Sequence, residues 1–392
     1  MSTFMAFQEA AHRQRLLFID LLRAFAILMM LQGHFIDTTL AESWRDKAAY
    51  PLYSYWAFMR GLTAPVFFFS SGLVFVFLLL RERGNAWANK RAVKGARRGL
   101  QLILTGYLLR LSFPALLHGR VPASFFYVDV LHCIGIALLG LVFFYVLSHY
   151  LRLPFPLWLA LAGGAAFFFY FDVKEADYAG WPVALQHYFH RELGAVFTPV
   201  PWVGFSFMGG ILGWLLHWRP SWAFGHALPV ALLAMGYLTD HYSSNWLIDW
   251  YEWTGLEQFR RHAYFNFLLK RLGEVWIVAA LFIWLAKYWQ TVPRLVLKIG
   301  GETLAIYEVH FVVLYGTWFG LGISTIWAYQ LNPWQAVAGA LLFVLAFVIF
   351  TAYLDRIGPV RWAWWGRQFQ RAYRLSRWQW YRLRSRGQQV LP

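Results

Sequence analysis

The first apolar segment of the sequence carries an arginine and a histidine. Arg23 and His34 are eleven residues apart, so in a regular α-helix they share one face and lie about 16.5 Å apart along the axis. Ionisable groups in apolar segments are costly and usually mark a site. Arg23 is a candidate clamp for a phosphate, or a topogenic charge paired with Asp20. His34 is a candidate general base or nucleophile, or a histidine satisfied by a neighbouring carbonyl or carboxylate.

Two further segments place histidines beside acids. "YVDVLHCIG" puts Asp129 and His132 at i and i+3, where a carboxylate can fix the tautomer of an imidazole. "GGETLAIYEVHFVVLYG" carries four polar candidates in an otherwise apolar helix, namely Glu302, Tyr307, Glu308 and His310. Because no pair of ligands has the i, i+4 spacing of a helical zinc site, we predict no metal.

The stretch "RGLTAPVFFFSSGLVF" begins at Arg60. Pro65 frees a backbone carbonyl one turn upstream, and Ser70 and Ser71 precede a glycine that permits close helix approach. The segment is either one wall of a pocket or a packing seam. The predicted pocket contains Asp20, Arg60, Ser70, Ser71, Glu302, Tyr307 and Glu308.

The composition that surrounds these residues is that of a membrane protein. Of 392 residues, 59% are hydrophobic, 20% aromatic and only 14% charged, which excludes an ordinary soluble domain. Cys133 is the only cysteine, so neither an intrachain disulfide nor a thiolate metal cluster can form.

Apolar runs long enough to cross a bilayer recur along the chain. We predict an all-α bundle of about ten transmembrane spans. Residues 1–355 form the transmembrane domain, and loops at about 172–199 and 240–267 lie on the outer face. The expected spans are 16–38, 57–80, 99–117, 126–149, 153–171, 200–217, 222–239, 268–288, 299–320 and 334–354.

The distribution of positive charge predicts the orientation. Seven Lys and Arg residues lie between residues 81 and 98, which places that loop in the cytoplasm and both chain ends inside. The segment 356–392 contributes nine arginines to a net charge of +16. Because these arginines alternate with Trp and Tyr, we predict an amphipathic helix on the cytoplasmic membrane surface and no nucleic-acid partner.

Three of these segments resemble a known group of enzymes. Arg23 and His34 match the R-x10-H pattern in the first span of membrane acyltransferase-3 proteins. "APVFFFSSGLVF" is similar to the second span of those proteins and of the heparan-α-glucosaminide N-acetyltransferase-like group. "ETLAIYEVHF" resembles their late Tyr-x-x-His span. The residues of "IDLLRAFAILMM" and "TAPVFFF" are more similar to the second group. One departure is Ala24, at a position where both groups commonly have Gly.

The resemblance implies transfer of an acyl group, usually acetyl, from cytoplasmic acyl-CoA to a sugar hydroxyl or amine on the outer face. On this hypothesis Arg23, Lys94, Arg97 and Arg98 hold the CoA phosphates, although the positive-inside rule alone also explains the last three. His34 is the base or acyl carrier, oriented by Asp129 or another acid. His132 and His310 polarise the thioester or position the acceptor.

Two other classes of function remain open at this point. A proton-coupled or anionic-solute transporter would also use intramembrane His, Asp and Glu, although the sequence gives no sign of paired broken helices or an internal repeat. A scaffold would use them only for packing. For the enzyme we expect the lipid bilayer, acyl-CoA and an envelope glycan as partners, and the bacterial inner membrane as the location. The sequence does not indicate the oligomeric state.

Overall fold

The computed structural model describes residues 17–191, 194–289 and 291–356, and these contain helices and no β-strand, only two isolated bridges. The chain divides into two compact units, Met1–Val344 and Leu345–Pro392. The helices are α2 (Leu17–Thr39), α3 (Pro51–Gly61), α4 (Thr63–Arg81), α5 (Lys90–Leu109), α6 (Phe113–Leu117), α7 (Val130–Leu151), α8 (Phe155–Phe168), α9 (Tyr170–Glu175), α10 (Val183–Gln186), α11 (Pro199–Trp218), α12 (Ala227–Thr254), α13 (Glu257–Tyr264), α14 (Phe267–Tyr288), α15 (Arg294–Gly301), α16 (Thr303–Tyr315), α17 (Ile323–Trp327) and Pro333–Arg356.

Within this part of the chain, five helices are long and apolar enough to cross a membrane: Leu17–Thr39, Pro51–Arg81, Ala123–Leu151, Pro199–Trp218 and Pro333–Arg356. They coincide with five predicted spans. Shorter apolar helices, α8 and α16, lie in two more, and the remaining three contain α5, α12 and α14, which carry charged side chains. An all-helical protein with several membrane-length apolar helices is therefore confirmed. The number of ten spans and the position of both ends inside remain predictions, and the predicted surface helix lies outside the described residues.

The predicted third span has the wrong boundaries. Helix α5 begins at Lys90, because the side chain of Asn89 caps its first turn and accepts a hydrogen bond from Arg91 N at 2.8 Å. It ends at Leu109, and the residues up to 117 form the separate short helix α6. The basic segment is therefore partly helical, and it brings Lys94, Arg97 and Arg98 onto α5.

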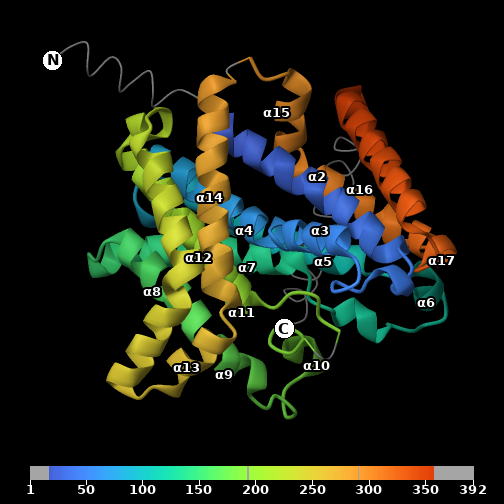
Figure 1. The fold of residues 1–392 in the computed structure, drawn as a ribbon, viewed down its shortest axis with the longest axis horizontal. Coiled ribbons are helices and arrows are strands. Elements are labelled where there is room, and N and C mark those ends of the chain that lie inside the picture. Colours follow the sequence, from blue (N-terminus) through green and yellow to red (C-terminus); the bar gives the residue numbers. More distant parts are fainter. Residues whose placement is uncertain (1–16, 192–193, 290, 357–392) are drawn as a thin grey trace, which may run out of the picture. The chain divides into compact units, whose positions relative to one another are not determined.

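The region 240–267, expected to be a loop, is largely helical. Helix α12 continues to Thr254 and ends at Gly255, whose φ of 70° is the left-handed cap that glycine adopts easily. Helix α13 follows, and then α14 packs against α12 along its length (Figure 1). Polar residues that looked like loop composition thus lie on helix surfaces.

Two predicted spans are interrupted helices; Pro65 indicated the first interruption, and the second was not expected. Residues 51–81 form α3 and α4 with a break at Leu62. Pro65 explains the position, because its ring displaces the carbonyl of residue 61 and it has no N–H to donate. The span around Glu302 is also divided, with this exposed glutamate at the junction of α15 and α16.

The small-residue face of α4 is a packing seam. A Cβ at Gly72 would collide with the carbonyl of Ser206 on α11, and one at Gly209 would collide with that of Phe69. Ser206 Oγ also donates to the Phe68 carbonyl at 3.0 Å. Such backbone proximity is how small residues stabilise helix pairs in membranes. The seam fixes α4 and α11 relative to each other, and it leaves the N-terminal ends of both helices to form one side of a cavity.

Candidate active site

A cavity of about 680 Å³ lies at one end of the helical bundle. Its lining comes from α16, the C-terminal half of α2, the C-terminal ends of α3 and α5, and the N-terminal ends of α4, α7, α11 and α14. This is the end opposite to the basic segment that joins α4 to α5. Its wall is mostly apolar, with a limited set of ionisable side chains: His34, Arg60, Arg110, Asp129, Arg191, Tyr307 and Tyr315.

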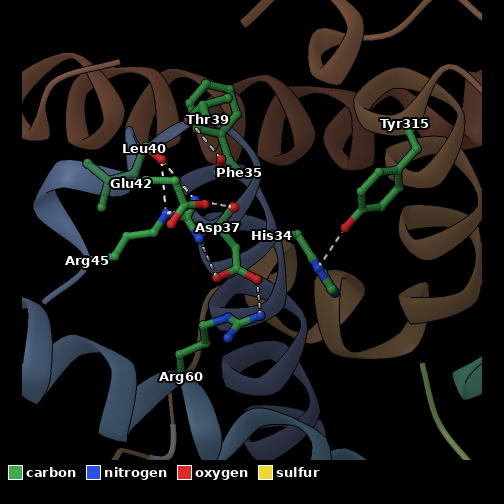
Figure 2. Close-up of polar contacts among 9 residues, drawn as sticks. All are labelled: His34, Phe35, Asp37, Thr39, Leu40, Glu42, Arg45, Arg60 and Tyr315. Carbon is green, nitrogen blue, oxygen red and sulfur yellow. Dashed lines mark hydrogen bonds and ion pairs between the residues drawn. The ribbon is translucent and has the colours of Figure 1, made fainter. Parts of the chain in front are cut away.

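His34 is positioned by α16. Its Nδ1 lies 2.9 Å from the hydroxyl of Tyr315, the last residue of that helix (Figure 2). The imidazole also stacks on the ring of His310, with centroids 5.5 Å apart and an interplanar angle of 27°. Because Nδ1 is occupied, Nε2 is the ring nitrogen left for a substrate. When Nδ1–H donates to Tyr315, Nε2 presents the lone pair that a base or nucleophile needs.

His310 is fully buried beneath His34 and does not line the cavity. Its Nδ1 lies 2.5 Å from the Tyr307 carbonyl. A carbonyl can only accept, so Nδ1 carries the hydrogen and the neutral ring has an unprotonated Nε2. That nitrogen is buried without a hydrogen-bond partner among the described residues. His310 is therefore suited to support the adjacent imidazole.

Asp129 forms a buried network with two residues from other helices. Arg110 Nη2 donates to one carboxylate oxygen at 2.9 Å, and the Tyr307 hydroxyl donates to the other at 3.1 Å. The Arg110 and Asp129 side chains are 12% and 10% exposed. The predicted pairing of Asp129 with His34 is not present, because the carboxylate is occupied by this network and Tyr315 is the partner of His34.

His132 serves as a capping residue. Asp129 is the N-cap of α7, and its backbone N–H donates to His132 Nδ1 at 3.1 Å. The imidazole is fully buried and meets the ring of Tyr107 on α5 at 4.4 Å, where Gly106 leaves room for it. It does not line the cavity. The two residues therefore lie at a helix start and do not form a shared catalytic face.

The segment before α11 covers part of the cavity. Arg191, Val196 and Phe197 line it, and Val196 N donates to the Val128 carbonyl at 3.1 Å. His187 of this segment is 3% exposed and packs on the ring of Tyr127 at 5.2 Å. Burial, and secondarily the charge of Arg110, lowers the pKa of His187. The segment is thus held by a neutral histidine.

Arg23 lies away from the cavity, at the junction of α2 with the broken helix pair. Its Nη2 donates to the Thr303 hydroxyl at 2.8 Å, at the first turn of α16. Nearby, Gly300 of α15 approaches the backbone of Asp20 so closely that a Cβ would collide with the Asp20 carbonyl. These contacts favour the structural interpretation of Arg23 over the phosphate clamp.

Most of the other predicted pocket and CoA residues also lie outside the cavity lining. Lys94 and Arg97 are exposed on α5, where Arg98 is half-buried. Ser70 and Ser71 both donate to the Phe67 carbonyl of their own helix, at 3.1 Å and 2.8 Å. Glu302 and Glu308 belong to the α15–α16 region. The predicted residues that the structure brings to the cavity are His34, Arg60, Asp129 and Tyr307.

Three ionisable residues of the cavity lining were missed, namely Arg110, Arg191 and Tyr315. Arg110 falls within the predicted third span, so the cost of an intramembrane charge should have identified it. Tyr315 is one tyrosine in an aromatic helix, and nothing in its spacing singles it out. Arg191 is one of several charges in a predicted loop. Among the described residues, no group of three or more His, Cys, Asp or Glu is placed to hold a metal.

A helical bundle with membrane-length apolar helices and a histidine-containing cavity defines an integral membrane protein with an enzyme-like site. The family model for the catalytic region of heparan-alpha-glucosaminide N-acetyltransferase matches residues 15–247, more than half of the chain. The chain belongs to this family, which makes it a transferase and gives the transporter alternative no support. Neither curated proteins nor solved structures give a significant match. The matched region ends before α14 and α16, which complete the cavity with Phe267, Tyr307 and Tyr315.

Proposed function

We propose that this protein transfers an acetyl group from acetyl-CoA to an amine or hydroxyl of a sugar, in the cavity lined by His34. The observation that carries the proposal is His34 itself. It lies in the first helix of a transferase family, opens into a cavity, and has one ring nitrogen fixed by Tyr315 and the other left for a substrate. The family's name supplies acetyl and a glucosaminide as the first groups to test.

The proposed chemistry needs one proton acceptor. His34 Nε2 takes the proton of the acceptor O–H or N–H as that atom attacks the acyl carbonyl, and the proton then goes to the departing thiolate. Alternatively, Nε2 attacks the carbonyl and carries the acetyl group to the acceptor. Both routes require Nδ1 to be the protonated nitrogen and to donate its hydrogen to the Tyr315 hydroxyl. His310 keeps the ring in place by stacking.

We further propose that the cavity faces outward and the basic segment faces the cytoplasm, as in a bacterial inner membrane. The positive-inside rule supports this orientation. Single cysteines at Asn85 and Asp177 in a Cys133→Ser background test it, since both positions are exposed and the native thiol is buried. An impermeant reagent added outside should label position 177 and not position 85. The reverse pattern would contradict transfer across the membrane.

Activity is tested with purified protein in nanodiscs, given acetyl-CoA and D-glucosamine. Free thiol and acetylated sugar are measured together, and methyl α-D-glucoside distinguishes hydroxyl from amine transfer. We expect His34→Ala to lower kcat by about 10³-fold, within the range for loss of a general base.

The matched control is His118→Ala. The Nδ1 atom of this histidine also has a hydrogen-bond partner, the Pro114 carbonyl at 2.7 Å, but the side chain is exposed and outside the cavity. The kcat of the His118→Ala variant should stay within about twofold of the wild type. Full activity in His34→Ala would overturn the proposed function.

A further inference from the structure

Arg60 is held beside His34 by the surface of α2. Its stem crosses α2 at Gly33, where a Cβ would lie 3.2 Å from Arg60 Cγ. Its guanidinium reaches the carboxylate of Asp37, three residues after His34, and forms an ion pair and hydrogen bond with it (Figure 2). Gly33, His34 and Arg60 all line the cavity. The charge of Arg60 is therefore fixed along the face of α2 that carries the histidine.

Asp37 is itself anchored. Arg45 approaches its carboxylate at 3.8 Å and donates to the Asp37 and Leu40 carbonyls at 2.5 Å and 2.9 Å. Arg60 has a second contact besides Asp37: its guanidinium carbon lies 5.9 Å from the centre of the Trp56 ring. Trp56 Nε1 in turn donates to Gln32 of α2 at 2.8 Å. Contacts from α2, α3 and the segment after α2 thus fix the guanidinium before any substrate arrives.

We propose that Arg60 stabilises the oxyanion formed during acetyl transfer, and that Gly33 and Asp37 position it. This proposal rests on the proposed function. As the acceptor or His34 attacks the acyl carbon, a new bond to carbon forms and the carbonyl π pair moves to oxygen. That negative charge lies in the cavity with a preorganised guanidinium. The carbonyl then re-forms as the C–S bond breaks. If His34 is the base, the thiolate leaves with the proton that His34 took from the acceptor; if His34 is the nucleophile, CoA leaves as the thiolate, and the acceptor proton is released when the acceptor attacks acetyl-His34.

Arg60 suits this role better than the other cavity arginine that is fixed by a carboxylate. Arg110 also lines the cavity, but it is only 12% exposed and directs Nη2 to Asp129 within the buried network. The side chain of Arg60 is 37% exposed, although it is paired with Asp37. It therefore has surface available to a reacting oxygen, and its position relative to α2 is constrained.

The test compares Arg60→Gln, Arg60→Lys and Asp37→Asn, with acetyl-CoA and D-glucosamine as probes and thiol release as the readout. An oxyanion donor acts on the transition state, so Arg60→Gln should lower kcat about 100-fold or more and change KM by less than about threefold. Arg60→Lys should retain kcat within about tenfold, because the charge remains. The kcat of Asp37→Asn should lie between those of the two Arg60 variants, because the guanidinium remains but loses its ion pair.

Arg261→Gln is the matched control. Arg261 also pairs with a carboxylate from another element, Glu175, and lies over an aromatic ring, Phe171, at 4.8 Å, but it does not line the cavity. Its kcat should remain within about twofold of the wild type.

Three results would overturn the role of Arg60. The first is a rise in KM with unchanged kcat in Arg60→Gln, which would indicate a ground-state anion clamp. The second is a decrease in kcat that is equal in Arg60→Gln and Arg60→Lys and is accompanied by a lower unfolding temperature in both variants. That result would indicate a structural role. The third is unchanged kinetics. A wild type that releases no thiol overturns the proposed function itself, and active wild type with inactive His34→Ala leaves that function standing whatever Arg60 does.

Discussion

The two ends of α2 each carry an ionisable side chain in an apolar helix, but their surroundings differ. At one end Arg23 binds Thr303 at the start of α16, where α15 packs closely on α2. At the other end His34 opens into the cavity and is held by Tyr315 at the end of the same helix α16. Helix α16 therefore contacts both, and only His34 lines the cavity. A polar side chain in an apolar helix can therefore belong to a helix junction, as Arg23 does, or to a candidate site, as His34 does. The Nε2 atom of His34, which is left for a substrate, distinguishes the two.

The buried ion pair at the cavity end should matter most for stability. Asp129→Ala leaves Arg110 without its carboxylate in a buried position, so we expect a loss of about 3–5 kcal/mol in the free energy of unfolding. Chemical denaturation followed by tryptophan fluorescence measures it. The control is Glu257→Ala, which removes the exposed Arg260 pair and should change stability little, because solvent screens exposed ion pairs. Equal losses in both variants would show that the network does not hold the cavity end together.

The hydroxyl of Tyr315 should affect catalysis more than folding. Tyr315→Phe keeps the ring and removes the partner of His34 Nδ1, so the productive tautomer is no longer favoured. We expect kcat to fall about tenfold or more, which corresponds to about 1.4 kcal/mol, with little change in KM. Tyr237→Phe is the control, because the ring of Tyr237 also contacts a histidine, His241, but outside the cavity. Unchanged kcat in Tyr315→Phe would remove this tyrosine from the site.

The Arg23 end should show the opposite pattern. Thr303→Val removes the hydroxyl that accepts from Arg23, and we expect a loss of about 1 kcal/mol in stability with kcat within about twofold of the wild type. Denaturation and thiol release measured on the same preparation report both. If kcat falls sharply while stability is unchanged, the junction takes part in catalysis and the contrast between the two ends of α2 is wrong.

The smallest effect concerns the segment that covers the cavity. Burial lowers the pKa of His187 in the folded protein, so below its unfolded pKa of about 6.5 the unfolded state binds more protons. Stability should therefore fall as the pH decreases from about 6.5 through the folded pKa, and His187→Phe should reduce this dependence. Hydrogen exchange of the described residues 183–191 at pH 7.5 and 5.5 measures the opening. Identical exchange at both pH values would show that His187 does not hold the segment.

The helical class and part of the site could be predicted because they depend on local rules. Apolar length located the five membrane-length helices among ten predicted spans, and polar residues in apolar segments pointed to His34, Asp129 and Tyr307. The helix breaks depend on context: Pro65 signalled one, whereas Glu302 gave no comparable signal. Hydrogen-bond partners could not be predicted from spacing. Asp129 joins Arg110 and Tyr307 only because α5 and α16 bring them there, and Tyr315 meets His34 across 281 positions of sequence.

The central claim is that acetyl transfer takes place at the His34 end of α2. The most direct test is a cryo-EM structure with an acetyl-CoA analogue in which a methylene group replaces the thioester sulfur. We expect the acyl carbonyl to lie in the cavity, within hydrogen-bonding reach of Arg60 and near His34 Nε2. An acyl end bound outside the cavity, for instance at the Arg23 junction, would contradict it.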